Sequence, residues 1–202
     1  MSGAPVRIGV FGGSFDPPHI GHFLCARVAA EHLRLDRVLV IPAAVQPHKP
    51  DQPTAPPELR WEMVKAAVVG DELFQPSSIE LDRGGISWTV DTLRELARRY
   101  PAPEYELYCL IGADALTEIE TWRDPDAIFK LARVAVMSRP GAPRPSASQW
   151  AEQAQFVQTP LIDLSSTWIR QRVAAGLPVG MMVGAAVEEI ILKNGLYRDR
   201  DG

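Results

Sequence analysis

The sequence predicts an α/β fold: a Rossmann-like, doubly wound, mostly parallel sheet with helices on both faces. Short apolar runs rich in β-branched residues alternate along the chain with segments of helical periodicity, which is typical of a parallel sheet. The chain has 202 residues, enough for one well-buried core and too few for two. A glycine pair, Gly12 and Gly13, ends the first apolar run, where sheets of this kind bind ligands.

Strands are predicted at five apolar runs: 6–11, 37–41, 78–81, 105–111 and 133–138. Apolar residues at helical spacing predict four helices. These cover 20–33, 58–69, 90–100 and 185–193, with Gly195 as the C-cap of the last one. Ser165 or Ser166 can cap a further helix that runs on to residue 173.

Two proline-rich segments, 42–57 and 139–146, resist helix formation and are expected to be loops. The first could close over a substrate. No internal repeat or true linker is visible. We therefore expect a single domain over 1–202, a nucleotide-binding N-terminal core with the helical segment 165–202 packed on it.

Composition argues against several classes of partner. The formal net charge is −4, and without a run rich in Lys or Arg this argues against nucleic acid as a partner. No apolar stretch is long enough to span a membrane. Residues 1–5 lack the features of a signal peptide, so a cytoplasmic protein is expected. The oligomeric state stays open, including a homo-oligomer.

The segment from Gly12 to His22 has the chemistry of a phosphate site. Glycines let the backbone approach a ligand, and the amides that begin the next helix are unpaired and carry positive dipole character. Phosphate favours that geometry. His19 and His22, three residues apart in a helix, would project from one face with Cβ atoms about 5–6 Å apart. A pKa near the ordinary value of about 6.5 would let either imidazole carry charge.

Other interpretations of these residues are weaker. A histidine in a helix is often only a half-exposed polar residue, and the glycine turn is what favours function here. A zinc site lacks a third ligand and a Cys cluster. A dinucleotide-binding turn lacks G-x-G-x-x-G and an acidic residue after the second strand, and the Walker sequence is absent.

Near the C-terminus, Ser165, Ser166, Thr167 and Arg170 form a second candidate phosphate site. Amides at the start of the helix, together with Arg170, would meet the β and γ phosphates of a nucleoside triphosphate. A plain capping serine beside a surface arginine is the alternative. Pairing with the glycine and histidine turn favours the functional interpretation.

The string GSFDPPHIGH at 13–22 resembles the T/SxGH and HxGH signature of the nucleotidyltransferase superfamily, and SSTWIR at 165–170 resembles its partner motif ISSTxIR. Three further segments narrow the resemblance to bacterial nicotinate-nucleotide adenylyltransferases: PHK at 47–49, RGGISWTVDTL at 83–93, and GADAL at 112–116 followed by Trp122. The chain departs from the family pattern at Trp88, commonly Tyr, at Val183-Gly184, where Pro is common, and at Leu164, usually Ile.

The resemblance implies that AMP is transferred from ATP to nicotinate mononucleotide, giving nicotinate adenine dinucleotide and pyrophosphate in NAD biosynthesis. The expected catalytic residues are His19, His22 and Arg170. The expected ATP-binding residues are Gly12, Gly13, Ser14, Phe15, Asp16, Gly112, Asp114, Arg139, Ser165, Ser166 and Thr167. The expected residues for nicotinate mononucleotide are His48, Lys49, Trp88, Thr89 and Trp122. Mg²⁺ is the expected cofactor, held mainly by the phosphates of ATP and not by a protein metal site.

Several of these roles have structural alternatives. Trp88 and Trp122 would also serve as core residues, and Lys49 as a solvated loop residue. Asp16 would position the histidine turn, hold a magnesium-bound water, or form an Asx turn before Pro17.

Three other functions compete with this interpretation. HIGH at 19–22 also matches the class I aminoacyl-tRNA synthetase signature, but no K-M-S-K-S segment follows. Phosphopantetheine adenylyltransferase has closer chemistry, but its relatives lack the Ser87-Trp88-Thr89 and Trp122 features. A catalytically silent nucleotide-binding regulator would be expected to have lost the histidines or the arginine, which are intact here.

Overall fold

The computed structural model describes residues 4–47, 55–138 and 149–198. Its strands form one parallel sheet in the order β3-β2-β1-β4-β5-β6. The strands are Val6–Gly13 (β1), Arg37–Pro42 (β2), Phe74–Pro76 (β3), Tyr105–Gly112 (β4), Arg133–Ser138 (β5) and Gln155–Gln158 (β6). The predicted α/β class with a parallel sheet is confirmed.

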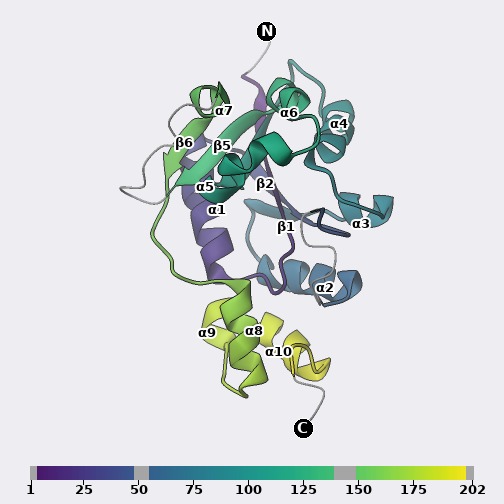
Figure 1. Cartoon of the computed structure of the whole chain (residues 1–202), viewed down its shortest axis with the longest axis vertical. Helices are drawn as coiled ribbons and strands as arrows, with labels where there is room; N and C mark the ends of the chain where they lie inside the picture. Colours follow the sequence, from purple (N-terminus) through teal and green to yellow (C-terminus); the bar gives the residue numbers. More distant parts are fainter. Residues whose placement is uncertain (1–3, 48–54, 139–148, 199–202) are drawn as a thin grey trace.

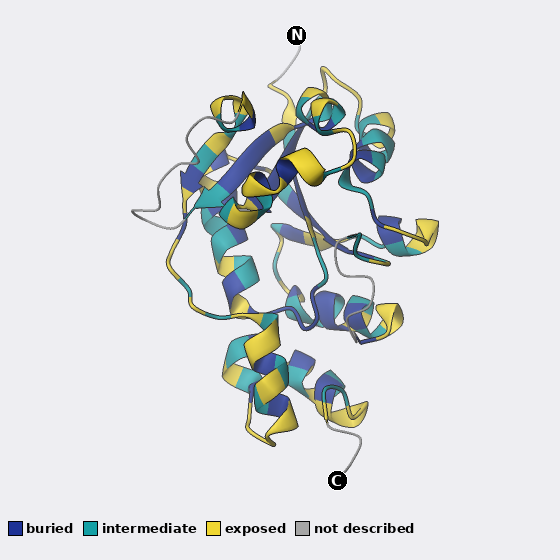
Figure 2. Cartoon of the chain, viewed as in Figure 1, coloured by how far each residue is buried: buried dark blue, intermediate teal, exposed yellow. Residues whose placement is uncertain are grey.

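Helices cover both faces of the sheet (Figure 1). Helices α1 (Ile20–Leu33) and α2 (Pro57–Ala67) contribute to a core cluster with Phe11 of β1. Ile8 and Val10 instead belong to the cluster that contains α4 (Thr89–Arg99) and α6 (Pro125–Leu131). Successive strand residues point to opposite faces, so both faces of β1 are covered. Its unbroken apolar run follows from this, and Figure 2 shows the central strands as largely buried.

The C-terminal helices build a third apolar cluster beside α2. They are α8 (Ser166–Ala174), α9 (Gly180–Val183) and α10 (Ala185–Lys193), and Figure 1 shows them below the sheet. Met63 of α2, Ile169 of α8 and Ile191 of α10 are buried together. This cluster attaches the second motif to the rest of the chain. The single-domain organisation over 1–202 stays a prediction.

The prediction of a strand at 78–81 is wrong. These residues begin helix α3 (Ile79–Arg83), and the strand lies earlier, at β3. The hydroxyl of Ser78 donates to the Asp82 carboxylate over 2.8 Å, which favours a local turn over extended backbone. Strand β3 is an edge strand that pairs with β2 alone, and there its Pro76 is tolerated.

The sequence also left several short elements unpredicted: α5 (Ala113–Thr117), the 3₁₀ turn η1 (Ile119–Thr121), α6, α7 (Gln149–Gln153), β6 and α9. Helix α4 begins and ends one residue earlier than predicted. Among the helices of the described residues, none combines the length and apolar character needed to cross a membrane.

The third cluster generates a stability prediction. Ile191 is fully buried, so Ile191→Ala should lower the free energy of unfolding by about 2–5 kcal/mol through lost burial and a cavity. The neighbouring Leu192 is 51% exposed, and Leu192→Ala should change that free energy by less than about 0.5 kcal/mol. Urea unfolding of both variants checks this. Equal losses would contradict the packing described.

Candidate active site

The sheet places the end of β1, the end of β4 and the start of α4 at one crevice. Its strand order reverses between β1 and β4, and ligands of such sheets bind outside the carboxyl ends of the strands at this point. Gly13 ends β1 and Gly112 ends β4. A cavity of about 460 Å³ lies there. Among the described residues its lining includes Gly12, Gly13, Ser87, Trp88, Thr89, Gly112, Asp114 and Trp122.

The glycine turn leaves its backbone bare. A Cβ added to Gly12 would have its nearest neighbour at 4.0 Å, the Ile41 carbonyl, so a ligand can approach the chain there. A Cβ on Gly13 would lie 3.3 Å from the Phe15 ring. Phe15 has a φ of 49° and is buried. Its ring packs edge-on against His22, with centroids 5.3 Å apart. The turn thus holds one of the histidines by direct contact.

The two histidines meet, although not as predicted. His19 is the N-cap of α1, with extended φ and ψ of −147° and 164°, and does not lie inside the helix. The imidazoles stack with centroids 3.6 Å apart and an interplanar angle of 24°. The His19 N–H donates to Nδ1 of His22 over 3.2 Å. Neutral His22 therefore carries its proton on Nε2, which is left as a hydrogen-bond donor.

Both histidines are neutral in the ligand-free protein at pH 7. Burial lowers the pKa of His19 to about 4. Burial and the neighbouring His19 together lower the pKa of His22 well below its ordinary value. The prediction of a pKa near the ordinary value was wrong, because spacing in the sequence does not show how far a ring is removed from water. At pH 7 the pair can therefore donate N–H hydrogen bonds to an anion but carries no positive charge.

The second motif contacts the first directly. Nη1 of Arg170 donates to the Asp16 carbonyl over 2.8 Å, and the Ser166 hydroxyl donates to the Pro17 carbonyl over 2.8 Å. Arg170 and Asp16 are 154 positions apart in the sequence. The structure therefore brings Arg170 to the turn that precedes the two histidines.

Other residues of the second motif orient Arg170 and begin its helix. Ser165 is the N-cap of α8, and its hydroxyl accepts from the Trp168 amide over 3.2 Å. Nη2 of Arg170 donates to the Thr167 hydroxyl over 3.2 Å. Each residue of the motif therefore has a structural contact, whatever its part in binding ATP.

Asp16 is a buried anchor of the histidine turn. Its Oδ1 accepts from the Ala55 amide over 3.0 Å and from the Tyr197 hydroxyl over 2.6 Å. Of the three roles considered for Asp16, these contacts support positioning of the turn. Tyr197 was not identified from the sequence, because only the fold brings the end of the chain to this turn.

Arg60 is a second residue that the sequence did not reveal. It is buried in α2, and its guanidinium donates to four backbone carbonyls, which belong to Ser14, Ala43, Ala44 and Ala55. The side chain thereby joins the turn after β1 to the segment after β2. An arginine on the otherwise apolar buried face of a helix is the one sequence signal that could have found it.

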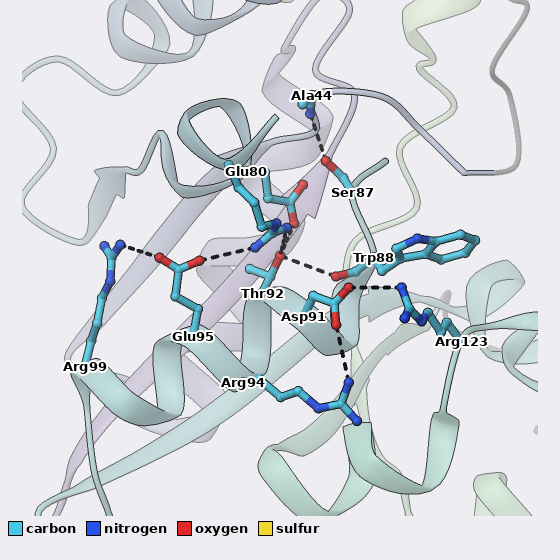
Figure 3. A network of polar contacts seen from close by, with 11 residues as sticks. Ala44, Glu80, Ser87, Trp88, Asp91, Thr92, Arg94, Glu95, Arg99 and Arg123 are labelled. Atoms are coloured by element: carbon cyan, nitrogen blue, oxygen red, sulfur yellow. Dashed lines mark hydrogen bonds and ion pairs between the residues drawn. The ribbon is translucent and has the colours of Figure 1, made fainter. Parts of the chain in front are cut away.

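A hydroxyl and carboxylate network holds the turn before α4 (Figure 3). The Thr92 hydroxyl donates to the buried Glu80 carboxylate over 2.6 Å, and burial raises the pKa of Glu80. The Ser87 hydroxyl accepts from the Ala44 amide over 2.9 Å. Trp88 is the N-cap of α4 and Thr89 its first residue. The Trp88 amide already donates to the Ile86 carbonyl, so the Thr89 amide is the better placed of the two to receive an anion.

The remaining predicted residues divide into three groups. Trp88 and Trp122 line the cavity and also pack against the core, so the core-packing interpretation is confirmed and their role in binding stays a prediction. Gly112 and Asp114 lie exposed at the start of α5. His48, Lys49 and Arg139 lie outside the described residues.

Comparisons with known proteins agree on one family. A family model described as cytidylyltransferase-like matches residues 10–172. A protein of Thermus thermophilus named as a probable nicotinate-nucleotide adenylyltransferase is 46% identical over 197 residues, covering 96% of this chain and all of the relative. A protein of Shouchella clausii with the same name is 40% identical, covering 96% and 98%.

Solved structures support the fold. The Plasmodium falciparum nicotinic acid mononucleotide adenylyltransferase complexed with NaAD superposes with a TM-score of 0.73 at 16% identity, covering 95% of this chain and 97% of that one. The same enzyme complexed with APC gives a TM-score of 0.71, with 95% and 96% covered. At this identity the likeness concerns the arrangement of the chain.

The lowered histidine pKa values predict acid sensitivity. In the unfolded chain a histidine titrates near pH 6.5, whereas folded His19 titrates near 4. Between these values the unfolded chain binds more protons, so the free energy of unfolding should fall as the pH falls from about 6.5 to 4. Urea unfolding across this range should show a shallower fall for His19→Gln than for the wild type. The exposed His32→Gln is the control, and a wild-type slope in His19→Gln would refute the assignment.

Proposed function

The chain belongs to the cytidylyltransferase-like family and, within it, to the nicotinate-nucleotide adenylyltransferases, and we propose that it transfers the AMP unit of ATP to nicotinate mononucleotide. The products are nicotinate adenine dinucleotide and pyrophosphate, a step of NAD biosynthesis. One observation carries the proposal. Arg170 and Ser166 bind the carbonyls of the turn that presents His19 and His22, beside a cavity lined by Trp88 and Trp122.

The chemistry needs alignment more than activation. A phosphate oxygen of nicotinate mononucleotide forms a bond to the α-phosphorus of ATP, and the bond from that phosphorus to the bridging oxygen of the β-phosphate breaks. The phosphate is already an anionic nucleophile, so no activated serine or cysteine is required. Holding the two phosphates in line can by itself lower the activation free energy by a large part of what catalysis requires.

The donors of the turn would stabilise the negative charge that moves onto pyrophosphate. Nε2–H of His22, the His19 imidazole and the Arg170 guanidinium are assigned this role. The first turn of α1 contains no acidic residue, so the positive end of its dipole is not cancelled there. The bare backbone from Gly12 to Phe15 would lie along the triphosphate.

The cavity would take the acceptor and the adenylate. The pyridinium ring suits the Trp122 indole face, and the carboxylate suits the amide at the start of α4, at Thr89. Gly112 and Asp114 are assigned to the ribose of the adenylate. We further propose that the mononucleotide phosphate is bound by His48 and Lys49, and that ATP is contacted by Arg139.

Mg²⁺ belongs to the proposal as a partner of ATP. Among the described residues, no three His, Cys, Asp or Glu side chains gather at one point. Oδ1 of Asp16, the acid within the turn, accepts from Ala55 and Tyr197, and its Oδ2 lies 3.9 Å from Nη1 of Arg170. Bound to the phosphates, the ion would neutralise part of their charge. A cytoplasmic location and a homo-oligomer stay predictions.

An assay with three acceptors tests the function. Purified protein is mixed with ATP and with nicotinate mononucleotide, nicotinamide mononucleotide or phosphopantetheine, and pyrophosphate release is measured. Release should be fastest with nicotinate mononucleotide. Release only with phosphopantetheine would move the chain to the other transferase, and no release with any acceptor would favour a silent nucleotide-binding protein.

The assignment of the histidines predicts a loss of turnover. His19→Ala and His22→Ala should each lower kcat by about 100-fold or more, comparable to removing one charge-stabilising donor. Circular dichroism and thermal unfolding should show that both variants remain folded. Near-normal kcat in both variants would remove the histidines from the mechanism.

Gly21 predicts a second effect on the same pair. A Cβ at this position would lie 3.0 Å from Nδ1 and 3.1 Å from Cε1 of His19, so in Gly21→Ala the imidazole must shift by a few tenths of an ångström. We expect kcat to fall about threefold or more, since misplacement by about 1 Å can cost 100-fold. Alanine is the better helix former, so stability should not fall in parallel. Leu24→Ala, exposed on the same helix, is the control. Unchanged kcat in Gly21→Ala would show that the ring position is not critical.

A further inference from the structure

The charges that line the cavity do not match the proposed acceptor. Three acidic residues line it: Glu80, Asp114 and Glu118. Nicotinate mononucleotide brings a carboxylate and a phosphate, both anionic. Among the cavity-lining residues that the structure describes, Arg123 is the one Lys or Arg. Among the described lining residues, this guanidinium is therefore the candidate partner for those anionic groups.

Arg123 is held beside the start of α4. Its Cζ lies 5.8 Å from the centre of the Trp88 ring, within cation–π range. Its Nη1 lies 3.3 Å from Oδ2 of Asp91, in the first turn of α4. Figure 3 shows the guanidinium next to the Trp88 indole, with Asp91 beside both. Two contacts thus fix a side chain that is otherwise 55% exposed.

Asp91 pairs with two arginines, and its single contact to Arg123 leaves most of the Arg123 donors unused. Arg94 also pairs with Asp91, through Oδ1 at 3.3 Å. A guanidinium has five N–H donors, and a single contact to Asp91 leaves most of them for a ligand. The α4 N-cap Trp88 makes no side-chain capping bond, so a carboxylate at Thr89 would meet both the helix start and Arg123.

We propose that Arg123 is a specificity residue that selects the acid over the amide at the pyridine ring, by pairing with the nicotinate carboxylate at the start of α4. The inference rests on the proposed function and deepens it. A neutral carboxamide gains no charge pairing with Arg123. It would also turn an N–H₂ group toward donors that need an acceptor.

Arg123→Gln tests the proposal, since it removes the charge and keeps a polar side chain. The value of kcat/KM for nicotinate mononucleotide should fall about 10-fold, the size expected for one charge-assisted hydrogen bond, while that for nicotinamide mononucleotide changes less than twofold. Arg123→Lys, which keeps the charge without the planar fork, should retain part of the preference. Arg94→Gln is the matched control, because Arg94 shares Asp91 but does not line the cavity.

Two outcomes separate the possible failures. Equal falls for both mononucleotides, or no fall for either, would overturn the role of Arg123; equal falls would assign it to the shared phosphate instead. A wild-type protein that makes no dinucleotide from either substrate would overturn the proposed function itself. Thermal unfolding of Arg123→Gln should match the wild type, since the side chain is mostly exposed.

Discussion

The junction between the two motifs is the constraint on which the rest of the site depends. Arg170 and Ser166 donate to the carbonyls of Asp16 and Pro17, the residues that lead into the histidine turn. Both acceptors are backbone atoms, so the contact fixes the path of the chain. The third apolar cluster holds α8 against α2 and thereby keeps Arg170 in place. The small C-terminal helices are therefore part of the site and not only a cover for the sheet.

The histidine pair is stable because it is neutral. Two imidazolium rings with centroids 3.6 Å apart would repel strongly in a buried setting. Burial resolves this by lowering both pKa values. A triphosphate would reverse the balance, because a nearby anion favours the protonated ring. The histidines are thus a neutral donor pair whose affinity for protons would rise if an anion bound beside them.

The sequence predicted the features that depend on residues close together in the chain. The glycine turn, the HxxH pair and the capping serine are patterns within a few residues, and the structure has a turn, a stacked pair and an N-cap at those positions. The prediction of a strand at 78–81 was wrong because a segment of four residues with two apolar side chains is equally compatible with a short helix. Arg60 and Tyr197 were missed for a different reason. Their partners are carbonyls and a carboxylate from distant segments, and no local pattern encodes such contacts.

The two halves of the site are built from different kinds of contact. Around the histidine turn, Arg60, Arg170 and Ser166 all bind backbone carbonyls, which every residue type supplies, and the bond from Tyr197 to the Asp16 carboxylate is the exception. Around the acceptor end, Glu80, Thr92 and Asp91 act through side-chain oxygens, which a single substitution removes. The half proposed for the triphosphate therefore depends largely on the path of the chain, whereas the half proposed for the acceptor depends on side-chain identity. Two contacts link the halves: Arg60 donates to the Ala43 carbonyl, and the Ser87 hydroxyl accepts from the Ala44 amide. In both, the partner in the segment after β2 is a backbone atom. Substitutions at the start of α4 can therefore change the acceptor preference without disturbing the proposed phosphate site.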